Sequence, residues 1–154
     1  MISKSNKVGE NIVMLVKCIG NTGECIDKAT KKWGDSISTK YPLKTGENYV
    51  IYGQFVCEGI IQYLVLGTYE NLPSWYPAEL FEMVENATSI EWYFKFKGYS
   101  NIPIAVWGYK ELVLDDAHYN SLIEREPKAI EIFLKRKKEI DEMENLRQQE
   151  YLEN

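Results

Sequence analysis

Hydrophobic and polar positions along this chain form short apolar runs separated by turn-forming residues. Runs of four to eight residues rich in β-branched and aromatic side chains are typical of strands. By this criterion we expect strands at 12–19, 49–56, 60–66 and 80–84, with a further pair at 91–97 and 104–107. The stretch at 24–41 is polar and has no sustained period, so it is predicted to be a long loop.

The two central runs are joined by Cys57-Glu58-Gly59. A short connection that contains glycine, between two apolar runs, predicts a β-hairpin. Pro73 and Pro77 follow the hairpin and bracket a short aromatic segment. Because proline fixes φ and cannot donate to a sheet ladder, this segment is expected to leave the regular sheet.

The pattern changes to a helical one at Asp115, a residue type that suits an N-cap. Apolar residues at helical spacing follow it, and Pro127 suits the first turn of a second helix. The apolar stripe of that helix weakens beyond Lys137. We therefore expect its last turns to project into solvent or to meet a partner.

Charge and composition exclude several classes of protein. Eighteen Lys and Arg against 23 Asp and Glu give a net charge of −5, which argues against binding to the phosphate backbone of nucleic acids. A hydrophobic content of 45% excludes wholesale disorder. No apolar run approaches the ~20 residues that span a bilayer, and the amino terminus lacks the apolar region of a signal peptide. We expect a soluble, cytoplasmic protein that does not bind membranes.

Residues that could carry chemistry are few. The three cysteines, Cys18, Cys25 and Cys57, are odd in number and form no C-x-x-C pair, so neither a disulfide framework nor a zinc knuckle is expected. The single histidine, His118, could form a dyad with Asp115 or Asp116, but we favour a partly exposed histidine in the first turn of a capped helix. No phosphate-binding, dinucleotide-binding, zincin or hydrolase motif is present. We therefore predict no catalytic residue, no metal and no cofactor.

A resemblance emerges when the segments are taken in order. A first strand that ends in Cys18-Ile19-Gly20-Asn21, a variable loop, Gly46 and Tyr49 before the hairpin, and a closing Trp75-Tyr76-Pro77 turn resemble the small SH3-like β-barrels of bacterial and phage proteins. The resemblance covers residues 12–85. It implies a mostly β (α+β) fold, with an SH3-like barrel over 1–114 and a helical extension over 115–154 that packs on the barrel.

A small acidic barrel with a helical tail is similar to immunity proteins that neutralise bacterial toxins. The resemblance implies a protein without enzymatic activity that occludes the active region of a basic toxin domain, as a monomer or weak homodimer. Aromatic and acidic residues would supply the interface. The candidate partner-binding residues are Trp33, Trp75, Tyr76, Glu79, Glu82 and Glu85.

Two other classes of function stay open. The first is a peptide-binding adaptor whose aromatic groove recognises a proline-rich or cationic segment. The second is a cofactor-independent enzyme that uses Cys57 as a nucleophile or a pair of acids such as Glu79 and Glu82. A core-packing role for the aromatic residues, four Trp and eleven Tyr in all, is the alternative to binding.

Overall fold

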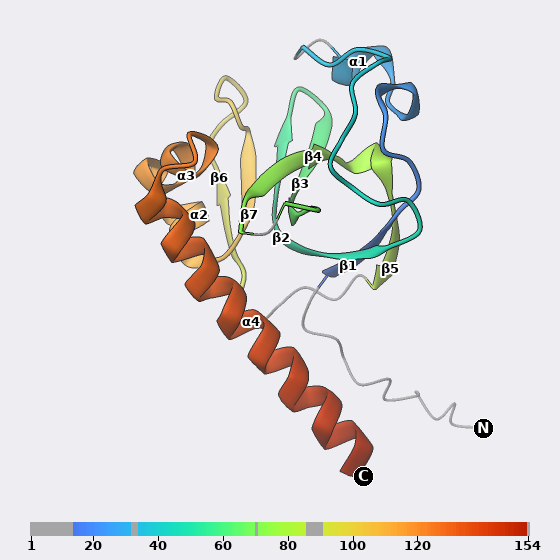
Figure 1. The fold of residues 1–154 in the computed structure, drawn as a ribbon. Coiled ribbons are helices and arrows are strands. Elements are labelled where there is room, and N and C mark those ends of the chain that lie inside the picture. Colours follow the sequence, from blue (N-terminus) through green and yellow to red (C-terminus); the bar gives the residue numbers. More distant parts are fainter. Residues whose placement is uncertain (1–13, 32–33, 70, 86–90, 154) are drawn as a thin grey trace, which may run out of the picture.

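The computed structural model describes residues 14–31, 34–69, 71–85 and 91–153 (Figure 1). These residues form an antiparallel sheet followed by helices. The strands are β1 (Met14–Cys18), β2 (Asn48–Cys57), β3 (Ile60–Leu66), β4 (Pro73–Pro77), β5 (Phe81–Glu85), β6 (Tyr93–Phe96) and β7 (Ala105–Gly108). The helices are α1 (Lys28–Lys31), α2 (Lys110–Leu114), α3 (Asp116–Ile123) and α4 (Pro127–Glu153), with 3-10 turns η1 (Gly23–Cys25) and η2 (Ala78–Leu80).

Strand pairing within the described residues follows the path β4-β3-β2-β1-β5. The first half of β2 pairs with β1 and its second half pairs with β7, which in turn pairs with β6. The prediction of a mostly antiparallel β-structure followed by helices is confirmed. The sheet is open, because β4 and β5 end the path on opposite sides without pairing. Closure into an SH3-like barrel therefore stays a prediction.

The predicted hairpin is confirmed. Strand β2 pairs with β3 up to Cys57 and Ile60, which leaves Glu58 and Gly59 as the connection. Both have positive φ, 50° and 79°. A two-residue turn with two positive φ angles matches the right-handed twist of the flanking strands, and glycine adopts it at no steric cost.

The segment between the two prolines differs from the expectation. Pro73–Pro77 forms β4, which pairs with β3 in the register Tyr63 opposite Tyr76. Proline is compatible with this strand because β4 lies at the edge of the sheet, where one side needs no ladder donors. The sequence rule that proline interrupts a sheet was therefore wrong here.

Helical structure begins at Lys110, five residues before the predicted boundary at 115. The predicted cap is confirmed: the Asp115 carboxylate accepts hydrogen bonds from the backbone N–H groups of Ala117 and His118. The loop expected at 24–41 contains η1 and the short α1.

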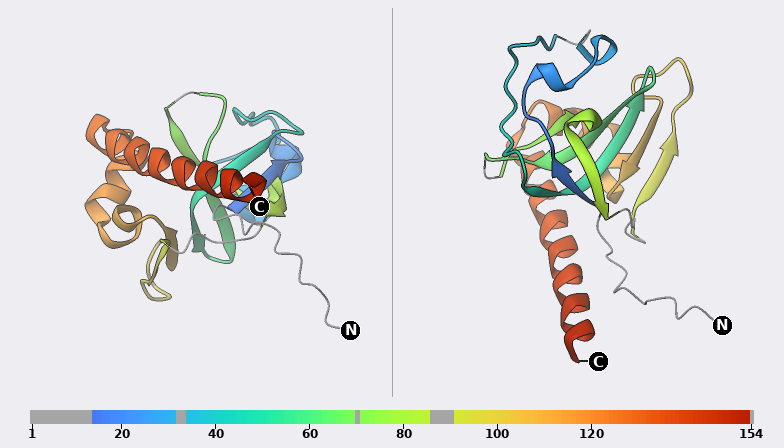
Figure 2. Two further views of the ribbon diagram at one scale, coloured as in Figure 1. Left: turned by 90° about the horizontal axis from the view of Figure 1, so that it is seen from below. Right: turned by 90° about the vertical axis from the view of Figure 1, so that its right-hand side faces the viewer.

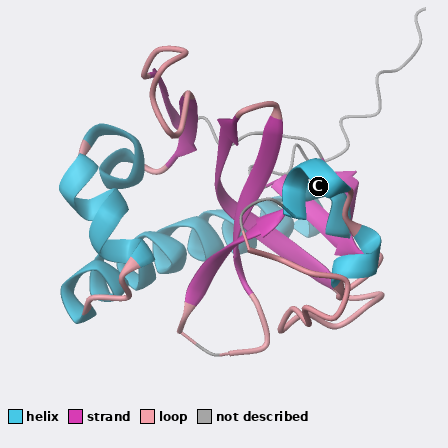
Figure 3. Ribbon diagram, turned by 90° about the horizontal axis from the view of Figure 1, so that it is seen from above, coloured by secondary structure: helices cyan, strands magenta, loops and turns pink. Residues whose placement is uncertain are grey.

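Two cores lie on opposite faces of the sheet. One joins β2, β3 and β7 to helices α2 to α4 and is centred on Phe133, which is fully buried. The other core is formed by side chains from β1, β2 and β5 and from the segments next to them. Val16 and Leu80 are among its most buried members. The strands thus occupy the centre of the fold and helices flank them (Figure 3).

The carboxyl-terminal part of α4 extends beyond the sheet (Figures 1 and 2). Leu146 and Leu152 in that part are 61% and 84% exposed. This agrees with the apolar stripe that weakens along the helix. None of the described helices combines the length and apolar character needed to cross a membrane.

Candidate functional site

Trp75 and Tyr76, two of the predicted partner-binding residues, pack inside the fold. They are neighbours on β4, so their side chains enter opposite faces of the sheet. The half-buried Trp75 ring lies 4.7 Å from that of Phe55, and its indole Nε1 is buried without a hydrogen-bond partner among the described residues. Tyr76 is 4% exposed and meets Tyr41 edge to face. The core-packing alternative therefore fits both rings in this structure.

The carboxylate of Glu79, in the turn η2, links the segment around α1 to the connection between β4 and β5. It accepts hydrogen bonds from the backbone N–H of Asp27, at 2.8 Å, and from the hydroxyl of Thr30. Thr30 is buried, and its hydroxyl also contacts Oδ1 of Asp27. Glu79 thus links two segments that lie far apart in the sequence.

The remaining predicted residues do not join it in one patch. Glu82 is exposed on β5, directly opposite Lys17 of β1. The side chain of Glu85 and the whole of Trp33 lie outside the described residues. The structure therefore brings no combined surface of tryptophan, tyrosine and acids together from the described members of the set.

A different aromatic surface lies across β3, β2, β7 and β6. Residues directly opposite each other in a sheet share a face, and the register gives two such rows. One row is Ile61, Val56, Ala105 and Phe96, and the other is Tyr63, Gln54, Trp107 and Phe94. Tyr99, from the loop after β6, adds its ring 5.2 Å from that of Phe96. We call Val56, Ile61, Phe94, Phe96, Tyr99 and Trp107 the aromatic face.

Much of the aromatic face is open to solvent. Phe94 and Phe96 are 54% and 51% exposed, and Tyr99 is 87% exposed. Phe94 packs against Trp107 with ring centroids 4.8 Å apart and ring planes tilted by 35°, so the two rings contact one another at the surface. Contiguous exposed apolar surface is uncommon on monomeric proteins, and where it occurs it usually marks an interaction site.

The other face of the same strands is covered by helices. Val106 of β7 is fully buried in the core with α2 to α4, and Lys95 of β6 lies opposite it. Lys97 reaches Asp116 of α3 at 2.7 Å, with its Nζ 5.1 Å from the ring centre of Tyr119. At β6 and β7 the sheet thus has one helix-covered face and one face on which aromatic side chains are exposed.

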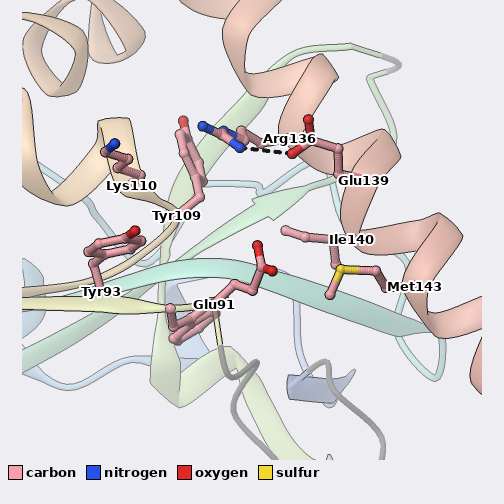
Figure 4. A pocket seen from close by; sticks show the side chains of 9 residues that line it. Glu91, Tyr93, Tyr109, Lys110, Arg136, Glu139, Ile140 and Met143 are labelled. Atoms are coloured by element: carbon pink, nitrogen blue, oxygen red, sulfur yellow. Dashed lines mark hydrogen bonds and ion pairs between the residues drawn. The ribbon is translucent and has the colours of Figure 1, made fainter.

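A small recess of about 80 Å³ lies where β6, α2 and α4 meet (Figure 4). Arg136 stands in its wall and holds Glu111 through two bonds of 2.8 and 2.6 Å and Glu139 through one of 2.9 Å. The guanidinium lowers the pKa of Glu111. Because three of its donors are engaged by carboxylates, Arg136 ties α2 to α4 here and is not presented to an anionic ligand.

His118 is buried, which corrects the expectation of a partly exposed ring. Its Nε2 lies 2.7 Å from the hydroxyl of Tyr109, and Nδ1 is buried without a hydrogen-bond partner among the described residues. Burial lowers its pKa. The carboxylate of Asp115 bonds to backbone N–H groups, so the described hydrogen bonds form no His–Asp dyad.

The described residues contain no cluster of three or more His, Cys, Asp or Glu that could hold a metal ion. Cys18 and Cys57 are buried and Cys25 is exposed, and all three are free thiols. Burial raises the pKa of Cys18, which makes its thiolate less available. Comparison of the chain with protein-family models, curated proteins and solved structures gave no match.

Sequence reasoning missed Phe94, Phe96 and Tyr99. A signal was present: β6 and the residue before it read Trp92-Tyr93-Phe94-Lys95-Phe96, with aromatic side chains at both alternating positions. A strand with one face on the core and one face in water should alternate between apolar and polar residues. The failure to alternate marks a strand that is apolar on its exposed side.

Proposed function

We propose that this protein binds another protein and that its aromatic face is the binding surface. The observation that carries the proposal is the contact of the exposed Phe94 ring with Trp107, on the side of β6 and β7 that no described helix covers. Large, rigid aromatic side chains are the commonest anchors of protein interfaces and lose little conformational entropy on binding. This arrangement needs no chemistry of its own.

The most specific form of the proposal is an immunity or inhibitor protein that occludes the active region of a bacterial toxin. A net charge of −5 supports a basic partner, because opposite net charges accelerate encounter between two proteins. Such a protein would act in the cytoplasm, without catalytic activity or cofactor. The aromatic face replaces Trp75 and Tyr76 as the proposed anchor, since those two rings are packed in the cores.

We also propose that the first part of the fold is an SH3-like barrel. Strands β2, β3 and β4 form an antiparallel meander, the 3-10 turn η2 follows, and β5 returns to pair with β1. A register shift in β2 after Ile51 bends the sheet at its centre, as closure of a small barrel requires. Nuclear Overhauser contacts between the backbones of β4 and β5 in solution would support closure, and their absence would exclude it.

The function is tested by co-expression with a toxin encoded beside the gene. We expect the wild-type protein to restore growth and to bind the purified toxin domain with a Kd on the order of nanomolar. A Phe94→Ala/Tyr99→Ala variant should weaken binding by about 100-fold or more. Ile37→Ala, a change at a 61% exposed residue in another loop, is the matched control and should bind normally.

Different results would favour another class. Micromolar binding to short proline-rich or cationic peptides, abolished by Phe94→Ala, would indicate the peptide-binding adaptor. An activity that Cys57→Ala or Glu82→Gln removes would indicate an enzyme. Normal toxin binding by the Phe94→Ala/Tyr99→Ala variant would exclude the aromatic face as the interface.

A further inference from the structure

Three strands end the sheet among the described residues, and they differ in how well their edges are protected. An unpaired strand edge invites pairing with another chain, and proteins block it with proline or charge. Edge strand β4 contains Pro73 and Pro77, and β5 contains Glu82 and Glu85. Edge strand β6 contains no proline, and its one charged residue is Lys95. It lies at the outer margin of the ribbon, in yellow in the right view of Figure 2.

Phe94 and Phe96 carry the backbone groups of β6 that no described strand pairs with. Lys97 donates its backbone N–H to the carbonyl of Ile104 on the β7 side, at 2.7 Å. Backbone groups of successive residues in a strand point to opposite sides, so those of Lys95 also point to β7. The N–H and C=O groups of Phe94 and Phe96 therefore point away from β7, and no described strand pairs with them.

From these observations we propose that β6 is the site of homodimerisation, pairing antiparallel with β6 of a second copy across a two-fold axis at Phe94. This register places Phe94 opposite Phe94 of the second copy and Tyr93 opposite its Lys95. Tyr93 is 41% exposed and lies on the same face of β6 as Lys95. The facing pairs are thus one aromatic pair and two pairs of a cation with an aromatic ring, all of which stabilise adjacent strands.

Lys95 favours this register over the one that is shifted by one residue. An axis shifted by one residue would place Lys95 opposite Lys95 of the second copy, where like charges face each other at the closest strand spacing. The side of β6 that bears Lys95 also carries Lys97, whose charge is neutralised by Asp116. The lysine at the centre of β6 therefore disfavours the shifted register and selects the one centred on Phe94.

The dimer extends the aromatic face. A two-fold axis perpendicular to the sheet keeps both copies of Phe94 and Phe96 on the same side. The surface proposed for partner binding would therefore be doubled and left uncovered. The inference does not depend on the proposed function, because the dimer forms without a partner.

Sedimentation velocity of the purified full chain, together with disulfide cross-linking, tests the inference. We expect a concentration-dependent dimer at about 100 µM protein, and Phe94→Asp, which brings two carboxylates face to face, should weaken it by about tenfold or more. In a Cys25→Ser background, which removes the exposed thiol, Phe94→Cys should form a covalent dimer on mild oxidation. Paired residues at this position have Cα atoms about 5.5 Å apart, within the range of a disulfide.

Matched variants make the outcome decisive. Lys95→Cys in the same background should cross-link more slowly than Phe94→Cys, and faster cross-linking would overturn the register. Leu146→Asp and Leu152→Asp change exposed residues on the projecting part of α4 and should leave the dimer intact. A monomer at every concentration up to about 100 µM, or a dimer lost in the α4 variants and kept in Phe94→Asp, would overturn the proposal.

Discussion

The hydroxyl of Tyr109 lies 2.7 Å from Nε2 of His118, in the interior between α2, α3 and α4. Tyr109 precedes α2 and His118 lies in the first turn of α3, so the contact joins the start of one helix to the start of the next. Phe133 of α4 packs against the Tyr109 ring, with centroids 6.3 Å apart. A buried polar contact thus lies within the helical layer.

This contact predicts that stability falls when His118 gains a proton. Burial lowers the pKa of the folded imidazole, while Glu111 and Asp115 oppose the shift. The unfolded chain therefore binds the proton first, and the free energy of unfolding decreases as pH falls below about 6.5, by up to about 1.4 kcal/mol per pH unit. Urea unfolding at pH 7 and pH 5.5 should show this decrease in the wild type. A His118→Phe variant with the same decrease would exclude His118 as its source.

The Arg136–Glu111 pair is predicted to stabilise the attachment of α4 to α2. Both side chains are about three-quarters buried, and Arg136 makes two bonds to Glu111. We expect Arg136→Ala to lower the free energy of unfolding by about 1–3 kcal/mol, since it leaves a largely buried carboxylate without its partner. Chemical denaturation measures this change.

An exposed ion pair on the same helix provides the control for that prediction. Lys138 lies 3.9 Å from Glu142, with both side chains mostly in solvent. Lys138→Ala should change the free energy of unfolding by less than about 0.5 kcal/mol. Equal effects of the two substitutions would contradict the role assigned to Arg136.

Because the pKa of Glu111 is lowered, the stability that the Arg136–Glu111 pair contributes should also be lost as pH falls through the acidic range.

Glu79 is predicted to act as a structural anchor. Glu79→Gln removes the charge that accepts the backbone N–H of Asp27, and a bond to a charged acceptor is worth about 1.5–3 kcal/mol. Hydrogen exchange at the Asp27 amide should therefore accelerate by about tenfold or more. Glu82→Gln, at an exposed strand position, is the control and should leave this amide unchanged. No acceleration in Glu79→Gln would return Glu79 to the list of candidate partner-binding residues.

Gly108 is predicted to tolerate no side chain. Its φ is +150°, and a Cβ atom there would lie 2.7 Å from Cδ2 of Leu112 and 2.9 Å from the carbonyl oxygen of Tyr52. We expect Gly108→Ala to lower the free energy of unfolding by about 2–4 kcal/mol. Gly34→Ala separates steric clash from backbone strain, because Gly34 also has positive φ but has nothing within 4 Å of its Cβ position. If thermal melts show that the two variants are equally destabilised, steric clash does not contribute to the effect of Gly108→Ala.

The sequence by itself determined the local elements. Runs rich in β-branched and aromatic residues located the strands on either side of Cys57-Glu58-Gly59, and Asp115 marked a helix start, because both signals depend on residues close together in the chain. The rule for proline failed at β4, because its position at the sheet edge depends on which strands pair.

Only the tertiary structure decided which aromatic and acidic residues are exposed. Trp75 and Tyr76 enter opposite cores, and Glu79 is engaged by Thr30, a residue 49 positions away in the chain. Phe94 is exposed because the helices cover the opposite face of β6 and β7. Burial of a side chain depends on contacts between distant segments, and no local spacing encodes them. The sequence therefore specified the strands, and their packing against the helices decided which aromatic side chains stay exposed.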